Sequence, residues 1–340
     1  MSIRRQPTTN PMTSRRYRRT STQHRHHQKR PRAIHKVPLT PSILEQLPLK
    51  GAGAKLQMLS ASTISRASFF DYRVLPERTQ IILSLLNADS ARSADDILTT
   101  YASDDSDAKR QITDTLRVLN DTGLVQRHVL QRAALFQLTQ LGQRLISEQA
   151  IRPALYADII HYLFFSHCDA PDAKGVVSGW SWVYQMTCRL LWHARPVVPK
   201  PTQLATNLNQ RVIEIYTDHI GGVHPNAPGG VLSWIRTLEP PFIDVNRKPG
   251  QSAGRSWCSP ELFMLGIARL YRLLSVPFGT PLLLDAQSLE QISILCLADL
   301  PCLEDVLDLC VATFSFFTTH SGEWGRSVIL TRDVTIPDVL

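Results

Sequence analysis

Two stretches of this sequence bring together side chains that could act on a substrate, and the first is HYLFFSHCD. It contains a set from which a Cys/His nucleophile could be built, namely His161, His167, Cys168 and Asp169. The rest of the stretch is apolar and fits a buried helix, where a histidine more often completes a core than performs catalysis. We therefore expect a structural role. The alternative, an enzyme based on His167 and Cys168, requires both in an open pocket with a third polar partner.

The second stretch, TDHIGGVHP, could bind a metal ion through Asp218, His219 and His224. It reads as a Gly/Pro loop and lacks a metal-ligand pattern such as HExxH. The six cysteines include no CxxC pair, and the three nearest the C-terminus are not spaced as zinc ligands. The sequence also contains no phosphate-binding loop or serine elbow. It therefore predicts no metal, no cofactor and no enzymatic activity, and its cysteine usage favours the reducing cytoplasm.

Basic side chains that could bind phosphate are concentrated at the N-terminus. Residues 1–36 hold nine Arg and two Lys without any Asp or Glu, whereas the rest of the chain has 26 basic and 29 acidic residues. This arm is polar and self-repelling, so we expect residues 1–38 to be disordered alone and to contact DNA phosphates. The predicted contacts include Arg15, Arg16, Arg18 and Arg19. A solvated tail, a targeting peptide or a start codon assigned too early would account for the arm equally well.

A Pro-punctuated connector at residues 39–74 leads into a regular pattern of helices. Pro76 fits the first turn of a helix, because a proline there loses no hydrogen bond. The apolar stripe predicted for this helix consists of Ile81, Ile82, Leu85 and Leu86. Ser93, followed three residues later by Asp96, predicts the N-cap of a short second helix with Ile97, Leu98 and Tyr101 facing inward.

A third helix is predicted from about residue 106 to residue 122, with Gly123 as its C-terminal stop. Its apolar face includes Ile112, Leu116 and Leu119, and we expect these residues to pack against Ile81, Leu85 and Leu98 of the first two helices. After Gly123 the apolar period changes to two, so LVQRHV and ALFQLT predict paired strands. The following segment, LTQLGQRLI, returns to helical spacing, with Thr139 as the N-cap of a closing helix.

Three helices, a β-hairpin and a closing helix over residues 75–150 resemble the winged-helix superfamily, in particular its MarR-like and PadR-like regulators. In those proteins the second hairpin strand ends in Leu-Thr before a helix with a glycine three positions on, a pattern that Thr139 and Gly142 match. The resemblance implies that the third helix enters the major groove of DNA while the hairpin contacts the neighbouring backbone. The residues implicated by position are Lys109, Arg110, Thr113 and Arg117 on the helix, and Arg127 and Arg132 on the hairpin.

Charge within this module opposes the DNA-binding interpretation. Residues 75–150 hold eight basic and ten acidic side chains, and Asp104, Asp105 and Asp107 crowd the start of the third helix, where they repel phosphate. Winged helices also bind proteins, and a fold does not fix a function. A scaffold that uses these modules to bind protein partners therefore remains the main alternative.

Residues 151–276 are apolar and predicted to be mostly helical. The order of helix, apolar strand, basic loop, short strand, Ser-Pro cap and long helix favours a second, divergent winged helix at about 176–275. Its hairpin would carry Arg247, Lys248 and Arg255, and a solvated hairpin tip explains this loop as well. Residues 277–340 predict two apolar helices followed by a strand at GRSVILTRD.

The whole chain thus reads as a cytoplasmic, mainly α-helical protein. Its longest apolar stretches fall short of the roughly 20 residues needed to span a bilayer, so we expect no membrane association. The sequence predicts a protein that binds double-stranded DNA, as a transcriptional regulator or as the DNA-engaging subunit of a larger assembly. A homodimer or other protein partners are compatible with this hypothesis.

Overall fold

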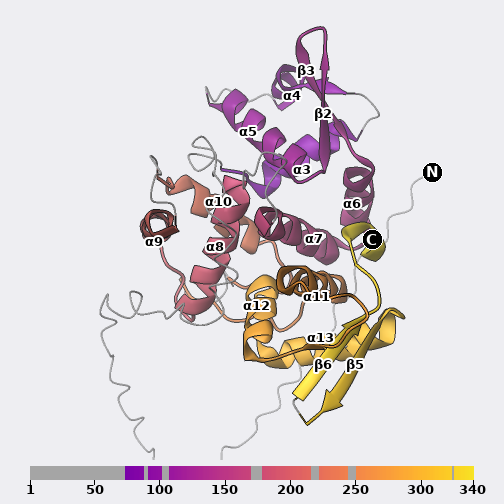
Figure 1. Cartoon of the computed structure of the whole chain (residues 1–340). Helices are drawn as coiled ribbons and strands as arrows, with labels where there is room; N and C mark the ends of the chain where they lie inside the picture. The colour runs from indigo at the N-terminus through magenta and orange to yellow at the C-terminus, as the bar shows by residue number, and fades with distance from the viewer. Residues whose placement is uncertain are drawn as a thin grey trace, which may run out of the picture. The chain divides into compact units, whose positions relative to one another are not determined.

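Twelve α-helices and two small antiparallel sheets make up the described part of the chain (Figure 1). The computed structural model describes residues 73–87, 91–101, 107–169, 178–215, 222–243, 250–323 and 325–340. The prediction of a mainly α-helical protein is confirmed for these residues. The arm, with Arg15, Arg16, Arg18 and Arg19, lies outside them, as does most of the connector. No helix in the described ranges is both long and apolar enough to cross a bilayer.

The first described elements are α3 (Pro76–Leu86), β1 (Arg92–Ser93), α4 (Ala94–Tyr101) and α5 (Ala108–Asp121). Pro76 occupies the first position of α3, where its missing N–H costs no hydrogen bond. Ser93 and Asp96 form reciprocal hydrogen bonds at the start of α4. The Asp96 amide donates to Ser93 Oγ at 3.1 Å, and the Ser93 amide donates to Asp96 Oδ2 at 3.0 Å. Both local predictions are confirmed.

The next elements are β2 (Val125–Leu130), β3 (Ala133–Leu138) and α6 (Gln140–Ile151). Gly123 ends α5 with a φ of 75°, as predicted. Thr139 caps α6, because its hydroxyl accepts the Gly142 amide at 3.1 Å. A Cβ on Gly142 would lie 2.2 Å from the Leu124 carbonyl oxygen, so glycine is required where α6 passes the start of the hairpin. Strand β1, which the sequence did not predict, pairs antiparallel with β3.

The apolar face of α5 is buried as predicted, and of the four residues expected to face inward on α3 only Ile81 does not pack against the core. Ile112, Leu116 and Leu119 are fully buried. The buried positions of α3 are Arg78, Thr79, Ile82, Leu83 and Leu86, whereas Ile81 is 40% exposed. The expected contact of Ile81 with α5 is therefore wrong. The segment IILSLL has more apolar residues than one helical face can hold, so packing rather than periodicity selects the buried stripe.

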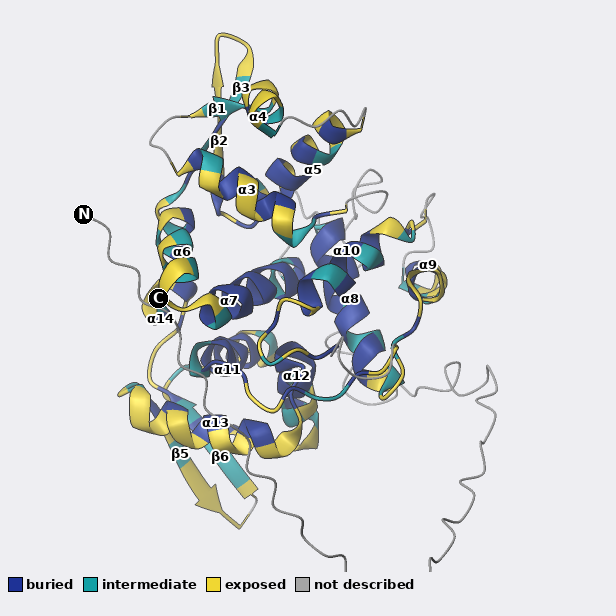
Figure 2. Ribbon diagram, turned by 180° about the vertical axis from the view of Figure 1, so that it is seen from behind, coloured by how far each residue is buried: buried dark blue, intermediate teal, exposed yellow. Residues whose placement is uncertain are grey.

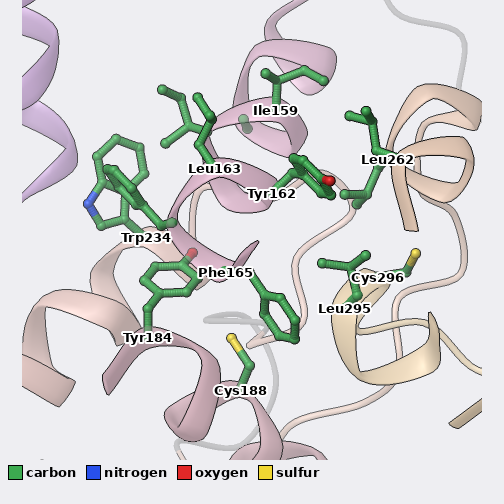
Figure 3. Packing of buried hydrophobic residues seen from close by; sticks show 14 of the residues in the cluster. Ile159, Tyr162, Leu163, Phe165, Tyr184, Cys188, Trp234, Leu262, Leu295 and Cys296 are labelled. Carbon is green, nitrogen blue, oxygen red and sulfur yellow. The ribbon is translucent and has the colours of Figure 1, made fainter. Parts of the chain in front are cut away.

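The central part of the chain is helical and deeply buried. Its helices are α7 (Pro153–Ser166), α8 (Gly179–Ala194), α9 (Pro201–Ile215), α10 (Asn226–Ile235) and α11 (Pro260–Leu274). Every residue of α7 from Leu155 to Phe165 is buried, and α7 packs against α6, α8 and α11. Figure 3 shows buried side chains of this core, among them Phe165 of α7, Tyr184 of α8 and Trp234 of α10. Phe164 lies edge-on to Trp234, with ring centroids 5.1 Å apart.

The strand pair expected near residues 241–257 is not formed by the described residues. Residues 241–243 and 250–259 contain no strand, and Gln251 and Arg255 make only isolated bridges to Val197 and Ala298. The backbone of Gly250 and Ser252 bonds to Val198 and Pro196, and one hydrogen bond, from the Ala253 amide to the Phe242 carbonyl oxygen at 3.2 Å, joins the two described parts of this segment. A second winged helix at about 176–275 therefore lacks its hairpin in the described residues.

A repeated arrangement occurs further along the chain. Its elements are α11, β4 (Leu282–Leu283), α12 (Ala286–Cys296), α13 (Leu300–Thr313), β5 (Phe317–Gly322) and β6 (Gly325–Leu330). The order is the same as from α3 to β3: helix, short strand, two helices and a hairpin. Helices α5 and α13 each have 14 residues, and the short strand pairs with the second hairpin strand in both sheets. The predicted strand at GRSVIL is confirmed as β6, and a final helix, α14 (Ile336–Val339), follows it.

The pairing of the two sheets matches residue by residue. In the first, Arg92 of β1 lies opposite Phe136, the fourth residue of β3; in the second, Leu282 of β4 lies opposite Val328, the fourth residue of β6. The residue after each hairpin is a threonine whose amide donates at 3.1 Å, from Thr139 to Leu124 O and from Thr331 to Phe316 O. Residues 260–331 therefore repeat the arrangement of the segment from α3 to β3.

Candidate nucleic-acid interface

The outer face of α5 carries the four side chains that the sequence assigned to it. Lys109, Arg110, Thr113 and Arg117 are all exposed, because Ile112 and Leu116 direct the opposite face into the core. Carboxylates engage part of the positive charge: Lys109 Nζ lies 2.7 Å from Asp95 Oδ1. Arg110 Nε lies 4.0 Å from an Asp114 oxygen. Exposed pairs of this kind contribute little to stability, typically less than about 1 kcal/mol, and they can exchange for other anions.

The hairpin β2–β3 carries positive charge without nearby acidic residues on the chain. From residue 122 to residue 147 the sequence contains no Asp or Glu but includes Arg127, His128, Arg132 and Arg144. By contrast, residues 77–121 hold nine acidic and five basic side chains. Arg127, His128 and Arg132 are exposed in the structure. The Arg127 amide donates to Asn120 Oδ1 at 3.1 Å, which links the hairpin to the end of α5.

The tip of this hairpin is also apolar, a feature that the sequence pattern did not lead us to predict. Val129 is 67% exposed and Leu130 is 60% exposed (Figure 2, hairpin above α3). All five residues of β2 after Val125 are exposed, so this strand projects beyond the core. The signal that could have found the tip is the sequence RHVLQR itself, in which basic residues flank two apolar ones and no acid is present.

The turn at the tip places two side-chain-bearing residues in the left-handed region. Gln131 has a φ of 46° and Arg132 a φ of 72°. Two-residue hairpin turns with positive φ at both positions favour Asn-Gly, because other residues are strained there by about 1–2 kcal/mol. Strain of this kind is concentrated at functional sites in proteins. The tip thus retains an arginine where glycine would be more stable.

Arg255 does not belong to any exposed basic loop, and its predicted DNA contact is wrong. Its side chain is 1% exposed, and its guanidinium donates to Asp158 Oδ1 at 2.8 Å and to three backbone carbonyls. Asp158 also accepts the Ser259 amide at 2.8 Å, so both partners of this buried pair are hydrogen-bonded. The ion pair of Arg255 with Asp158 therefore joins the segment before α11 to α7. Arg247 and Lys248 lie outside the described residues.

His161 is a core histidine, as expected. It is 1% exposed, its Nδ1 lies 2.9 Å from the Tyr184 hydroxyl, and its Nε2 lies 2.6 Å from the Leu295 carbonyl oxygen. Burial lowers the pKa of His161 to about 4, since the charged ring would lose its hydration. The imidazole is therefore neutral near pH 7 and has hydrogen-bonding partners at both nitrogens.

The remaining members of HYLFFSHCD do not form an open catalytic pair. Cys168 is buried, and burial raises the pKa of its thiol to about 12, which disfavours the nucleophilic thiolate. Asp169 forms an ion pair with Arg269, itself buried, and accepts from Gln185 Nε2 at 3.0 Å. Burial lowers the pKa of His167, which is half-buried. The geometry gives these residues a packing role.

The second candidate stretch is only partly described, because Asp218 and His219 lie outside the described residues. His224 is exposed, and its Nδ1 accepts the Asn226 amide at 3.2 Å. Among the described residues, no three His, Cys, Asp or Glu side chains are grouped so that they could hold a metal ion. All six cysteines are buried and free.

A shallow hollow of about 560 Å³ lies at the end of α8, away from the hairpin β2–β3 in sequence. It is lined by Trp192, Arg195, Ser252 and Asp299, among others. The Arg195 guanidinium stacks 3.3 Å from the centroid of the Trp192 ring and pairs with Asp299. The positive charge of Arg195 is therefore already balanced, and the hollow has no excess charge that would select an anion.

No protein-family model matches this chain, and no curated protein matches it. Among solved structures, the fold resembles a magnesium ion-bound crystal structure of SspB, with a TM-score of 0.51 and 10% sequence identity. The match covers 80% of this chain and 86% of the SspB chain. At this level of identity the likeness concerns the fold alone.

Proposed function

We propose that this protein binds double-stranded DNA through a winged-helix module at residues 75–150. In this proposal α5 enters the major groove and the β2–β3 hairpin lies on the adjoining DNA. The protein would act as a transcriptional regulator or as the DNA-engaging subunit of a larger assembly. The order α3, β1, α4, α5, β2, β3, α6 supports the module, since it is the order of a winged helix with its short third strand.

The observation that carries the proposal is the hairpin, where Arg127, His128 and Arg132 are exposed on a segment without carboxylates. Phosphate binding by arginine is electrostatic, so an acid-free projecting segment is better suited to DNA than the outer face of α5. On α5, Lys109 and Arg110 are already close to carboxylates. We therefore assign most of the affinity to the hairpin and sequence discrimination to α5.

A second candidate function is protein binding by the C-terminal repeat. Helix α13 holds Glu304, Asp305 and Asp308 but no Lys or Arg, and Leu309 and Val311 are exposed on it. Such a surface would repel DNA and suit a basic, partly apolar protein segment. The two repeats would then contact different classes of partner. The magnesium named for SspB is not transferred to this chain, whose described residues hold no group of three or more His, Cys, Asp or Glu side chains that could bind a metal ion.

A salt-titrated binding assay tests the DNA-binding proposal. Full-length protein is compared with residues 37–340 on random and genomic duplexes, by fluorescence anisotropy at several salt concentrations. The logarithm of the binding constant falls linearly with the logarithm of the salt concentration. Removing residues 1–36 should make this slope shallower by about 0.9 for each phosphate that the arm neutralises, and equally for all DNA sequences. Any preference between sequences should survive in residues 37–340.

The double variant Arg110→Ala/Arg117→Ala is the matched test of α5. It should reduce discrimination by about 1–3 kcal/mol for each base that these arginines recognise, while the salt slope changes little. If residues 37–340 bind no DNA at low salt and the double variant behaves like the wild type, the module does not bind DNA. Protein binding would then become the leading function.

A further inference from the structure

The hairpin tip exposes apolar side chains on both of its faces. Val129 and Leu130 are the last two residues of β2, and neighbouring side chains in a strand point to opposite faces of the sheet. Both are more than half exposed. Single exposed apolar residues are common on protein surfaces, but two adjacent ones at the end of a projecting hairpin form a narrow apolar edge.

The C-terminal hairpin shows that this edge is not needed to build the turn. Strands β5 and β6 are also six residues each and are also joined by two residues. At the two positions that match Val129 and Leu130 by register, β5 has Ser321 and Gly322. The same strand pairing thus forms with a serine and a glycine at these two positions. The exposed valine and leucine of β2 therefore require an explanation other than folding.

The charges beside the edge indicate what it contacts. Arg127 and His128 precede Val129, and Arg132 follows Leu130 in the strained turn, with no carboxylate within the segment 122–147. An apolar edge between cationic side chains is complementary to the minor groove of duplex DNA, where phosphates line both walls and stacked bases form the floor. The hydrogen bond from the Arg127 amide to Asn120 holds the strand against the end of α5 and so orients the tip.

We propose that the tip of the β2–β3 hairpin is a wedge that enters the minor groove of duplex DNA and partly unstacks one base step through Val129 and Leu130. This inference rests on the proposed DNA binding and goes beyond backbone contact by the hairpin. Apolar wedges of this kind kink the duplex by about 20–90°. The kink forms most readily at a flexible TA step, so the protein should prefer such steps without reading their base edges.

The test measures DNA bending separately from binding. A duplex of about three helical turns with a central TA step carries a donor and an acceptor fluorophore at its ends. Energy transfer reports bending, and anisotropy reports binding on the same duplex. Wild-type full-length protein should increase energy transfer at saturation, and it should do so less on a duplex whose centre is a stiff A-tract.

The variant Val129→Thr/Leu130→Thr removes the apolar edge but keeps strand-forming residues. It should bind within about threefold of the wild type at low salt, because the arginines remain, yet lose most of the increase in energy transfer. Ile151→Thr is the matched control, since Ile151 is 73% exposed at the end of α6 and lies outside the hairpin. This control should bind and bend DNA like the wild type. Thermal melting of each variant establishes that it is folded.

The outcomes that overturn the inference can be distinguished from one another. If the wild type binds DNA without bending it, or if the double-threonine variant bends DNA fully, the wedge is wrong while DNA binding stands. If the wild type binds no DNA at low salt, the proposed function fails and the wedge with it. If the double-threonine variant loses only co-flotation with phosphatidylserine vesicles and its bending is unchanged, the apolar edge serves a lipid surface instead.

Discussion

Hairpins β2–β3 and β5–β6 bury matching positions and expose different chemistry. The first residue of the leading strand and the fourth and sixth residues of the following strand are buried in both. At the tips, however, Val129 and Leu130 stand where the second hairpin has Ser321 and Gly322. The buried positions must fill a core of fixed shape, whereas the exposed positions are free to vary.

The helices that precede the two hairpins differ in the same way. Each has 14 residues and a buried apolar face, but α5 exposes Lys109, Arg110 and Arg117 whereas α13 exposes Glu304, Asp305 and Asp308. One backbone arrangement therefore exposes lysine and arginine side chains on this helix in one copy and carboxylates in the other. In our proposal, exposed charge rather than the shared fold decides which class of partner each repeat binds.

The largest expected effect concerns the shared core. Leu116→Ala in α5 and Leu307→Ala in α13 each remove a buried side chain from the helix that leads into a hairpin. Each should lower the free energy of unfolding by about 2–5 kcal/mol, the usual range for a core truncation. Urea denaturation followed by circular dichroism measures the loss. Arg117→Ala, on the exposed face, is the control and should cost less than about 0.5 kcal/mol. A comparably small loss for either leucine would contradict the shared framework.

The next effect should separate the two hairpins in DNA binding. Arg127→Ala/Arg132→Ala should weaken binding to all duplexes by about tenfold or more and reduce the salt slope by about 0.9 for each phosphate that these arginines neutralise. Arg326→Ala is the control, because Arg326 lies on β6 and pairs with Asp308. Its DNA affinity should match the wild type in the same anisotropy titration. Equal losses of affinity in both variants would show that the hairpins do not differ as proposed.

The smallest effect should come from the strained turn. Gln131→Asn places a residue that tolerates the left-handed region at a φ of 46°, so it should stabilise the protein by up to about 1 kcal/mol. DNA affinity should be unchanged, since the arginines remain. Arg132→Gly should stabilise the protein similarly but weaken DNA binding. Thermal melting compares the stability of the two variants, and fluorescence anisotropy compares their DNA affinity. A destabilised Arg132→Gly variant would argue against strain at the tip.

Short-range features of the fold could be predicted because their causes lie within a few residues. The N-caps at Ser93 and Thr139 and the stop at Gly123 depend on hydrogen bonds and backbone angles that neighbouring residues define. The change of apolar period after Gly123 likewise specified the hairpin. The short strands β1 and β4 could not be predicted, since two residues show no periodicity and pair only with strands distant in sequence.

The features of the candidate site likewise fall into those that the sequence could predict and those that it could not. The exposure of Lys109 and Arg117 on α5 and the place of Arg127 and Arg132 on the hairpin were predictable, because amphipathic spacing and turn position settle which residues face solvent. The role of Arg255, by contrast, becomes apparent only in the folded chain. Its loop looks exposed from its Gly and Pro content, but Asp158, 97 residues earlier, becomes its partner in the core. Burial of a charge depends on a partner that the fold alone brings near, so no local pattern could reveal it.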